Sequence, residues 1–101
     1  DVNAKDRNGR TALWMAASGG RTETAKVLIC AGADISARDW DGHTALHWAA
    51  INDKTETAKL LISKGTDVNA KGSDWRTALS IAKEERYDDT VSLLKAAGAK
   101  G

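Results

Sequence analysis

Two histidines and one cysteine are the residues of this chain best suited to metal or nucleophilic chemistry. His43 and His47 lie four residues apart, so one helix turn could present both imidazoles to a metal ion, with Cys30 and nearby aspartates as further ligands. A zinc site would normally include a second cysteine or histidine pair at ligand spacing, which the sequence lacks. Cys30 has no histidine or lysine cluster beside it and is interpreted as an inert surface thiol. The sequence therefore predicts no metal site.

Other catalytic signatures are also missing from the sequence. It contains no Gly-x-Gly-x-x-Gly phosphate loop and no Ser–His–Asp set on a strand-turn-helix motif. Lysine and arginine number 15 against 14 acidic residues, a net charge of +1 that gives no reason to expect nucleic acid. No apolar run is long enough to cross a membrane, and the first ten residues are too polar for a signal peptide. These features predict a protein that is not an enzyme, needs no cofactor and resides in the cytoplasm or nucleus.

An internal repeat organises the whole chain, which aligns with itself at an offset of 33. The string Thr-Glu-Thr-Ala-Lys occurs at 22–26 and again at 55–59, and no insertion interrupts the register. Other equivalent positions are Thr11, Thr44 and Thr77, then Gly32, Gly65 and Gly98. A fixed period of this length is typical of a solenoid. We expect one domain over 1–101 with units 1–33, 34–66 and 67–101.

The middle unit predicts a turn, a helix, a second turn and a second helix. Residues 39–42 form a turn cluster, and Thr44 is a good N-cap for a helix over 45–52. A second helix is expected over 55–64, with apolar residues on one face. Gly65 then supplies the left-handed residue that ends it.

The motifs of this unit resemble those of ankyrin repeats. The string Gly-x-Thr-x-Leu-His-x-Ala-Ala covers 42–50, and the link Gly-x-Asp-[Val/Ile]-x-Ala covers 32–37 and 65–70. The resemblance covers essentially the whole chain. It implies an all-α solenoid of stacked antiparallel helix pairs, from which short β-hairpin loops project and leave a concave face. It also implies a module that binds other proteins.

Some positions depart from the family pattern. Trp75 replaces the hairpin glycine, so the third turn is expected to be built differently. Lys83 and the acidic residues after it give the last unit the polar cover of a C-terminal cap. The first unit has no such cover. We therefore expect further repeats upstream of Asp1, and we expect the first unit to open first.

Tryptophan points to a binding surface. With Leu46 as the reference at 100° per residue, Trp48 and Ile51 fall away from the core face of their helix. The register of the repeat aligns Trp48 with Met15 and Ile81. Trp40 lies at the tip of the middle hairpin, which in the family lines the concave face. The predicted partner-binding residues are Arg10, Met15, Trp40, His43, Trp48, Ile51, Trp75, Arg76 and Ile81.

Two of these assignments have structural alternatives. Trp48 occupies a position that commonly packs against neighbouring repeats, so it could belong to the core. Trp75 could face either way. Trp14 replaces the motif histidine and is expected to pack between units, whereas the surviving histidine, His47, is implied by the resemblance to hydrogen-bond the motif threonine and neighbouring loops.

The leading functional prediction is a monomeric module that binds another protein through its concave face. The alternatives are a structural spacer, a fragment of a longer array that binds elsewhere, and an engineered binder on this scaffold. The basic residues of the hairpins hint at an acidic border on the partner. The resemblance also implies that Asn3 and Asn69, in the inter-unit links, are candidates for hydroxylation by an asparaginyl hydroxylase.

Overall fold

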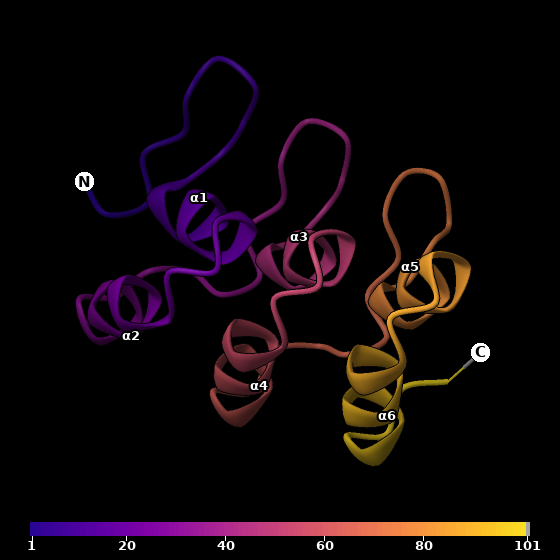
Figure 1. Ribbon diagram of the computed structural model, residues 1–101. Helices are drawn as coiled ribbons and strands as arrows, with labels where there is room; N and C mark the ends of the chain where they lie inside the picture. The colour runs from indigo at the N-terminus through magenta and orange to yellow at the C-terminus, as the bar shows by residue number, and fades with distance from the viewer. Residues whose placement is uncertain (101) are drawn as a thin grey trace.

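The computed structural model describes residues 1–100 and contains six helices in three pairs (Figure 1). The helices are α1 (Ala12–Ser18), α2 (Thr22–Cys30), α3 (Ala45–Ile51), α4 (Thr55–Ser63), α5 (Ala78–Glu85) and α6 (Asp88–Ala96). The starts of α1, α3 and α5 occupy equivalent positions of the three units, as do those of α2, α4 and α6. Both helices of the middle unit end one residue earlier than expected, because Asn52 and Lys64 are C-caps.

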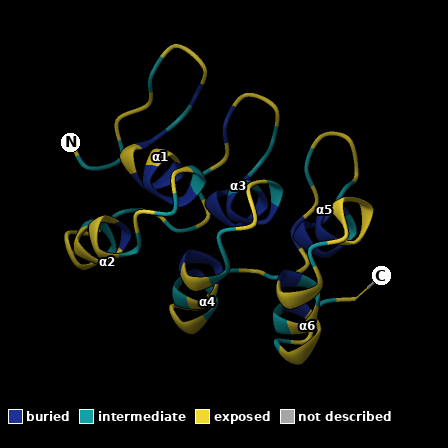
Figure 2. Ribbon diagram, in the orientation of Figure 1, coloured by how far each residue is buried: buried dark blue, intermediate teal, exposed yellow. Residues whose placement is uncertain are grey.

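The pairs stack side by side into two rows of helices. One row contains α1, α3 and α5, and the other contains α2, α4 and α6, while long loops project beyond the first row (Figure 1). We call the row of α1, α3 and α5 the inner row and the row of α2, α4 and α6 the outer row. Each helix packs against its partner in the pair and against its neighbours along the row. The inner row is buried over most of its surface, whereas the outer row exposes one side to solvent (Figure 2).

Threonine starts every inner helix. Thr11, Thr44 and Thr77 each have extended backbone, and each hydroxyl accepts a hydrogen bond from the N–H three residues later. In α3 and α5 the side chain of the residue three positions after the threonine also accepts a hydrogen bond from the threonine N–H. These reciprocal bonds are capping boxes, made by His47 in α3 and by Ser80 in α5.

His47 also joins the second unit to the third. Its Nδ1 accepts from the Thr44 N–H at 3.1 Å, so Nε2 carries the proton and donates to the Arg76 carbonyl at 3.0 Å. The side chain is fully buried. Burial is the main cause that lowers the pKa of His47 below its ordinary value, and the Arg76 carbonyl opposes this shift only in part.

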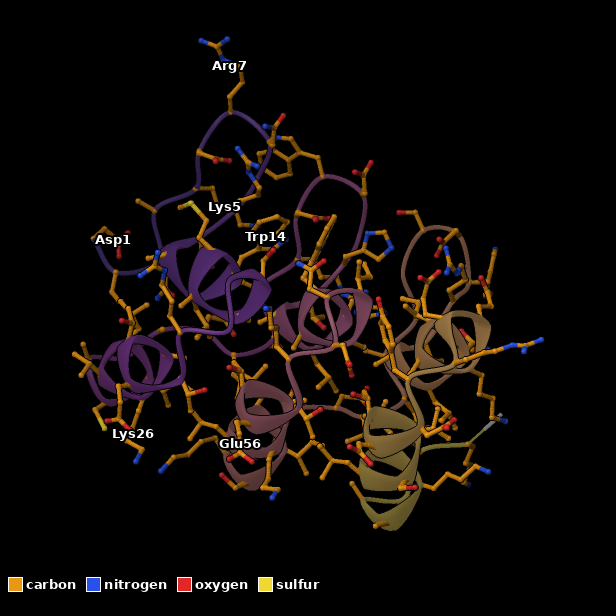
Figure 3. The ribbon with its side chains drawn as sticks, viewed as in Figure 1. Asp1, Lys5, Arg7, Trp14, Lys26 and Glu56 are labelled. Atoms are coloured by element: carbon orange, nitrogen blue, oxygen red, sulfur yellow. The ribbon has the colours of Figure 1, made fainter. Side chains whose placement is uncertain are left out.

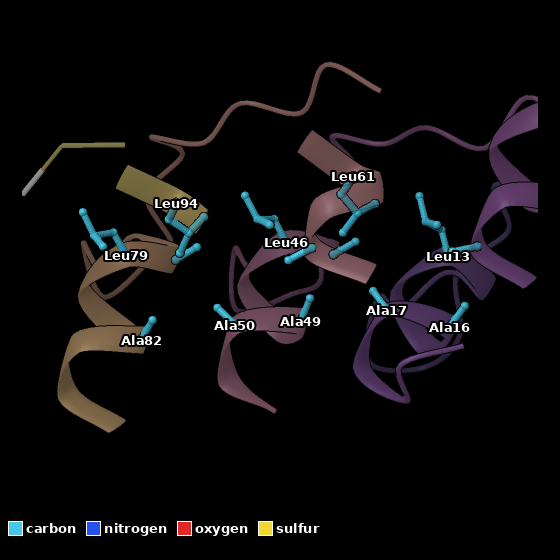
Figure 4. Packing of buried hydrophobic residues seen from close by; sticks show 14 residues of the cluster. Leu13, Ala16, Ala17, Leu46, Ala49, Ala50, Leu61, Leu79, Ala82 and Leu94 are labelled. Atoms are coloured by element: carbon cyan, nitrogen blue, oxygen red, sulfur yellow. The ribbon is translucent and has the colours of Figure 1, made fainter. Parts of the chain in front are cut away.

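Small and branched apolar residues alternate in the core. Buried alanines lie on the inner helices, and buried leucines lie between the two rows (Figure 4). The fully buried leucines of this core are Leu13, Leu46, Leu61, Leu79 and Leu94. Alanine lets neighbouring helices approach closely, which sets the spacing of the stack.

The three projecting loops share one hydrogen-bond pattern. In the first loop the Gly9 N–H donates to the Asp6 carbonyl at 3.0 Å, and the Asp6 N–H donates to the Arg10 carbonyl at 3.0 Å. The same two bonds recur at the equivalent positions of the second and third loops. Two bonds do not make a strand ladder, and none of residues 1–100 lies in a β-strand. The expected β-hairpins are therefore projecting hairpin-shaped loops without strands.

The third loop was expected to differ, and that expectation is wrong. The Trp75 N–H donates to the Gly72 carbonyl at 2.9 Å, as in the other two loops. Trp75 achieves this with φ +66°, close to the +78° of Gly9 and Gly42. The hydrogen-bonded frame thus imposes a left-handed backbone on a residue with a Cβ, which is a strained conformation.

The two ends of the stack differ in polarity. At the first unit Met15 is 47% exposed and Val27 is 66% exposed, although their equivalents Trp48 and Leu60 are partly buried. At the last unit the exposed end of α5 carries charged residues, Lys83 among them. The first unit is therefore the less protected one.

We expect the first unit to open before the second. Amide hydrogen exchange should be faster over 11–31 than over 44–64, because α2 has one buried residue whereas α4 has three. Exchange that is slower in the first segment than in the second would contradict this.

Trp75→Gly should raise the free energy of unfolding by about 1 kcal/mol, because glycine adopts a left-handed backbone without the Cβ clash. The indole is 77% exposed, so little packing is lost. Urea denaturation measures the change. The control is Trp75→Ala, which removes the same indole but retains a Cβ. Equal stability of the two variants would show that the backbone is not strained.

The stability of the protein should fall as the pH is lowered below about 6.5, the ordinary pKa of histidine. The depressed pKa of His47 means that the unfolded chain binds a proton in this range while the folded chain does not. His47→Ser copies the capping box of α5 and should flatten this dependence. Melting temperatures at neutral and mildly acidic pH test it, and an unchanged slope in the variant would exclude His47 as the cause.

Candidate functional site

The three loops are hydrogen-bonded to one another in series. The Trp40 N–H donates to the Asn8 carbonyl at 3.2 Å, and the Ser73 N–H donates to the Asp41 carbonyl at 3.2 Å. Side chains add to this. Lys5 Nζ donates to the Arg38 carbonyl at 2.8 Å, and the Arg38 guanidinium donates in turn to the Lys71 carbonyl at 2.6 Å. The loops therefore form one connected surface rather than three independent arms.

Trp40 is exposed but held in place. Its indole is 65% exposed, while Nε1 donates to the Arg7 carbonyl at 2.9 Å. The ring packs against Gly9 so closely that a Cβ there would lie 2.5 Å from Trp40 Cδ2. Lys5 Nζ lies 5.0 Å from the ring centroid, within the range of a cation–π contact. Trp40 is thus a large apolar side chain with little freedom to move.

A buried carboxylate holds the next two tryptophans together. Trp14 Nε1 donates to Asp39 Oδ2 at 2.9 Å, and Trp48 Nε1 donates to the same oxygen at 3.2 Å. The two rings are tilted, with centroids 4.8 Å apart. Trp14 therefore packs between units, as expected, and extends from α1 toward the second loop (Figure 3). Trp48 is partly buried. Its exposure is therefore intermediate between that of a core residue and that of a residue on an open binding surface, the two alternatives considered for it.

The other Asp39 oxygen shapes the loop. Oδ1 accepts from the N–H groups of Asp41 and His43, each at 2.9 Å. Burial alone would raise the pKa of Asp39, but the bonds from His43, Trp14, Trp48 and Asp41 outweigh it and lower the pKa below its ordinary value. Asp39 is accordingly ionised at neutral pH.

The sequence did not indicate this role of Asp39. The available signal was its register, because Asp39 is equivalent to Asp6, which accepts from the N–H groups of Asn8 and Arg10 in the same way. What the register could not show is that Trp14 and Trp48 converge on the remaining oxygen.

A cleft of about 260 Å³ opens beside this cluster. Its walls come from the first two loops and from the two helices below them. The lining residues are Asn8, Arg10, Trp14, Asp39, Trp40, Asp41 and Trp48. A larger, open hollow of about 560 Å³ lies at the end of the stack, bordered by Trp75, which is 77% exposed, and by Lys71.

The apolar strip predicted from the helical angle is only partly accessible. Met15 is 47% exposed and Ile51 is partly buried, so both can reach a surface. Ile81 is 1% exposed, and its assignment to an accessible strip is wrong for this structure. The helical angle placed it away from its own helix core but could not show what the neighbouring unit covers.

The charged and basic residues predicted to bind a partner already interact with other residues of the protein. Arg10 Nε bonds Asp6 at 2.9 Å, and the Arg10 guanidinium carbon lies 5.3 Å from the Trp14 ring centroid. Arg76 Nη2 bonds Glu84 at 2.9 Å. His43 lies between two carboxylates. Its Nδ1 is 3.9 Å from Asp39 Oδ1, and its Nε2 is 3.7 Å from Asp74 Oδ1.

The residues considered as metal ligands were also located in the structure. Asp39, Asp41 and His43 bring ligand-type atoms within 4.8 Å of one another. Both Asp39 oxygens, however, are already acceptors in the loop and tryptophan bonds. His47 uses both ring nitrogens in the capping box and its bond to the third loop, and Cys30 is exposed on α2. Hydrogen bonding within the protein therefore explains the arrangement.

The two candidate hydroxylation sites lie in the links between units. Asn3 Oδ1 accepts from the Asp34 N–H at 2.6 Å, and Asn69 Oδ1 accepts from the Lys100 N–H at 2.8 Å. Asn69 is exposed and Asn3 is partly buried. Each amide oxygen thus accepts from the backbone N–H 31 residues later, so the two asparagines make equivalent bonds.

Within residues 1–100, no helix is long and apolar enough to cross a membrane. A comparison with curated proteins finds no match. A comparison with family models finds ankyrin repeats in three copies, with matches over residues 1–72 and 41–100. Ankyrin repeats generally act as non-enzymatic scaffolds that bind other proteins. The helix pairs that recur once in each unit and the family match over nearly the whole chain agree, and the chain belongs to the ankyrin-repeat family.

Proposed function

We propose that this protein binds another protein through the surface formed by its three loops and the adjoining sides of α1 and α3. The observation that carries the proposal is Trp40, a tryptophan that is 65% exposed and yet fixed by a hydrogen bond and by contact with Gly9. The surface formed by the three loops and the adjoining sides of α1 and α3 is called the loop surface below. Trp40, Trp48 and Arg10 line one cleft of this surface. We include in it the other predicted residues that are not fully buried, which are Met15, Ile51, His43, Trp75 and Arg76.

The chemistry of Trp40 supports this choice. Tryptophan is among the residues most enriched where binding energy concentrates, because it buries a large rigid area. An exposed side chain usually loses rotamer freedom on binding, which opposes association. The bond from Trp40 to the Arg7 carbonyl restricts the indole before any partner arrives. This preorganisation favours a role as an anchor.

The hydrogen bonds between the loops support a surface that acts as a unit. Arg38, for example, bonds the Gly42 carbonyl within its own loop and the Lys71 carbonyl in the next, both at 2.6 Å. Little backbone ordering is then left for the binding step. A structural spacer with no partner at this surface is the alternative, and it predicts that Trp40 can be removed without consequence for binding.

Trp40→Ala should weaken binding by about 2 kcal/mol, or roughly thirtyfold in Kd. The melting temperature should fall only modestly, because the indole is mostly exposed and the loss is confined to its contacts with the first loop. A partner is first captured from cell lysate on the immobilised protein, and its affinity for each variant is then measured by calorimetry. Val27→Ala is the matched control, because Val27 is equally exposed at 66% but lies on α2 in the outer row. Equal affinities of Trp40→Ala and the unaltered protein would refute the proposed surface.

Trp48→Ala separates packing from binding. We expect a lower melting temperature, because the substitution removes the ring beside Trp14 and one donor to Asp39. Affinity measured well below the melting temperature should also fall. Normal affinity in a folded but destabilised variant would assign Trp48 to the core and leave Trp40 as the anchor.

A further inference from the structure

The cleft beside Trp40 is lined by three indoles and by more negative than positive side chains. Asp39 and Asp41 contribute carboxylates, whereas Arg10 contributes the single guanidinium of the lining. Asp6 already neutralises Arg10 through a 2.9 Å ion pair. The cleft therefore presents a surplus of negative charge next to aromatic rings.

No lysine or arginine within residues 1–100 forms an ion pair with Asp39. Its oxygens accept from two indole N–H groups and two backbone N–H groups, and all four donors are neutral. His43 Nδ1 lies 3.9 Å from Asp39 Oδ1. A buried carboxylate with neutral donors attracts cations strongly, because little solvent screens it.

Asp41 extends this negative charge to the open rim. It is exposed, and in the part of the chain that the structure describes no cationic group forms an ion pair with it. Unlike Asp39, its carboxylate is thus available to contact a ligand directly. The hydrogen bond from Ser73 uses the Asp41 backbone carbonyl rather than the side chain.

The tryptophans already hold cations of the protein itself. The Arg10 guanidinium lies 5.3 Å from the Trp14 ring centroid, and Lys5 Nζ lies 5.0 Å from that of Trp40. Indole faces attract guanidinium and ammonium groups, and more so where water is excluded. Trp14 and Trp40 thus already interact with a cation of the protein, whereas within residues 1–100 no such contact is made by Trp48, the third indole of the cleft.

We infer that the cleft between the first two loops takes a lysine or arginine side chain of the partner protein, with Asp41 as its ion-pair partner and the tryptophans beside it. This inference rests on the proposed function and specifies the chemistry of the partner. The side chain enters at the exposed rim, and Asp39 attracts it from the floor of the cleft.

The opposite chemistry, an acidic partner, was suggested by the basic residues of the loops. The structure uses most of these residues internally. Arg38 bonds two carbonyls, and Arg76 bonds Glu84. Arg7 points outward from the end of the first loop (Figure 3), away from the Trp14 cluster. Among the residues that line the cleft, Asp41 is the exposed charged group without an ion-pair partner in residues 1–100, which favours a basic segment.

Capped pentapeptides of glycine with one central residue test the inference. The central residue is arginine, lysine, trimethyl-lysine, glutamate or norleucine, and the readout is the set of indole N–H signals in ¹⁵N NMR spectra of the whole chain. Peptides with a cation should shift the signals of Trp14, Trp40 and Trp48 saturably at millimolar concentration, and added salt should weaken binding. The norleucine and glutamate peptides should not bind.

Asp41→Asn should weaken binding of the arginine and lysine peptides about threefold, the size expected for one exposed ion pair. Glu56→Gln, which removes an exposed charge from α4 in the outer row, is the matched control and should have no effect. Equal binding of norleucine, preference for glutamate, or no saturable shift with the cationic peptides would each overturn the inference.

The outcome is separable from that of the proposed function. If the peptides fail while Trp40→Ala still weakens partner binding, the loop surface remains and the cationic occupant is wrong. If the peptides bind but Trp40→Ala has no effect on a captured partner, the cleft recognises cations but is not the site at which that partner binds.

Discussion

The inner helices α1, α3 and α5 stack at close range because alanine occupies the positions where they meet. Ala17, Ala49, Ala50 and Ala82 are completely buried in this row. A larger side chain at any of them would push neighbouring helices apart, since a packed core has few voids to absorb extra volume. The spacing of the stack fixes the spacing of the loops. Only loops at this spacing can bond one another as Trp40 bonds Asn8.

Asp39 converts that spacing into a specific arrangement of side chains. The indole donors come from α1 and α3, and the backbone donors come from its own loop, so one carboxylate joins two units. Removing such a buried charge would leave several donors unsatisfied, each at a cost of about 1–3 kcal/mol. The same carboxylate gives the neighbouring cleft its negative charge. Structure and proposed recognition thus depend on one buried group.

The loops also show how a repeat tolerates an unfavourable residue. Trp75 adopts a backbone that glycine provides in the first two loops, because the bonds of the loop and the adjoining helix determine the turn. Strain at a single exposed residue is small compared with the cooperative packing of the stack. Its result is a second exposed indole at the end of the loop surface, next to the open hollow.

The sequence by itself determined the repeat, the six helices and the threonine caps of the three inner helices. These features depend on residues three or four apart and on the period of the repeat, which are visible in one dimension. It also identified Trp40 as a residue at a loop tip, where exposure follows from position.

The tertiary structure decided how exposed each equivalent residue is. Met15, Trp48 and Ile81 share one register position, yet the first is 47% exposed, the second partly buried and the third 1% exposed. The position is the same on each helix, but the surroundings differ, since the first unit has no described helix pair before it. The convergence of Trp14 and Trp48 on Asp39 likewise joins residues 25 and 9 positions apart, and only folding brings them together.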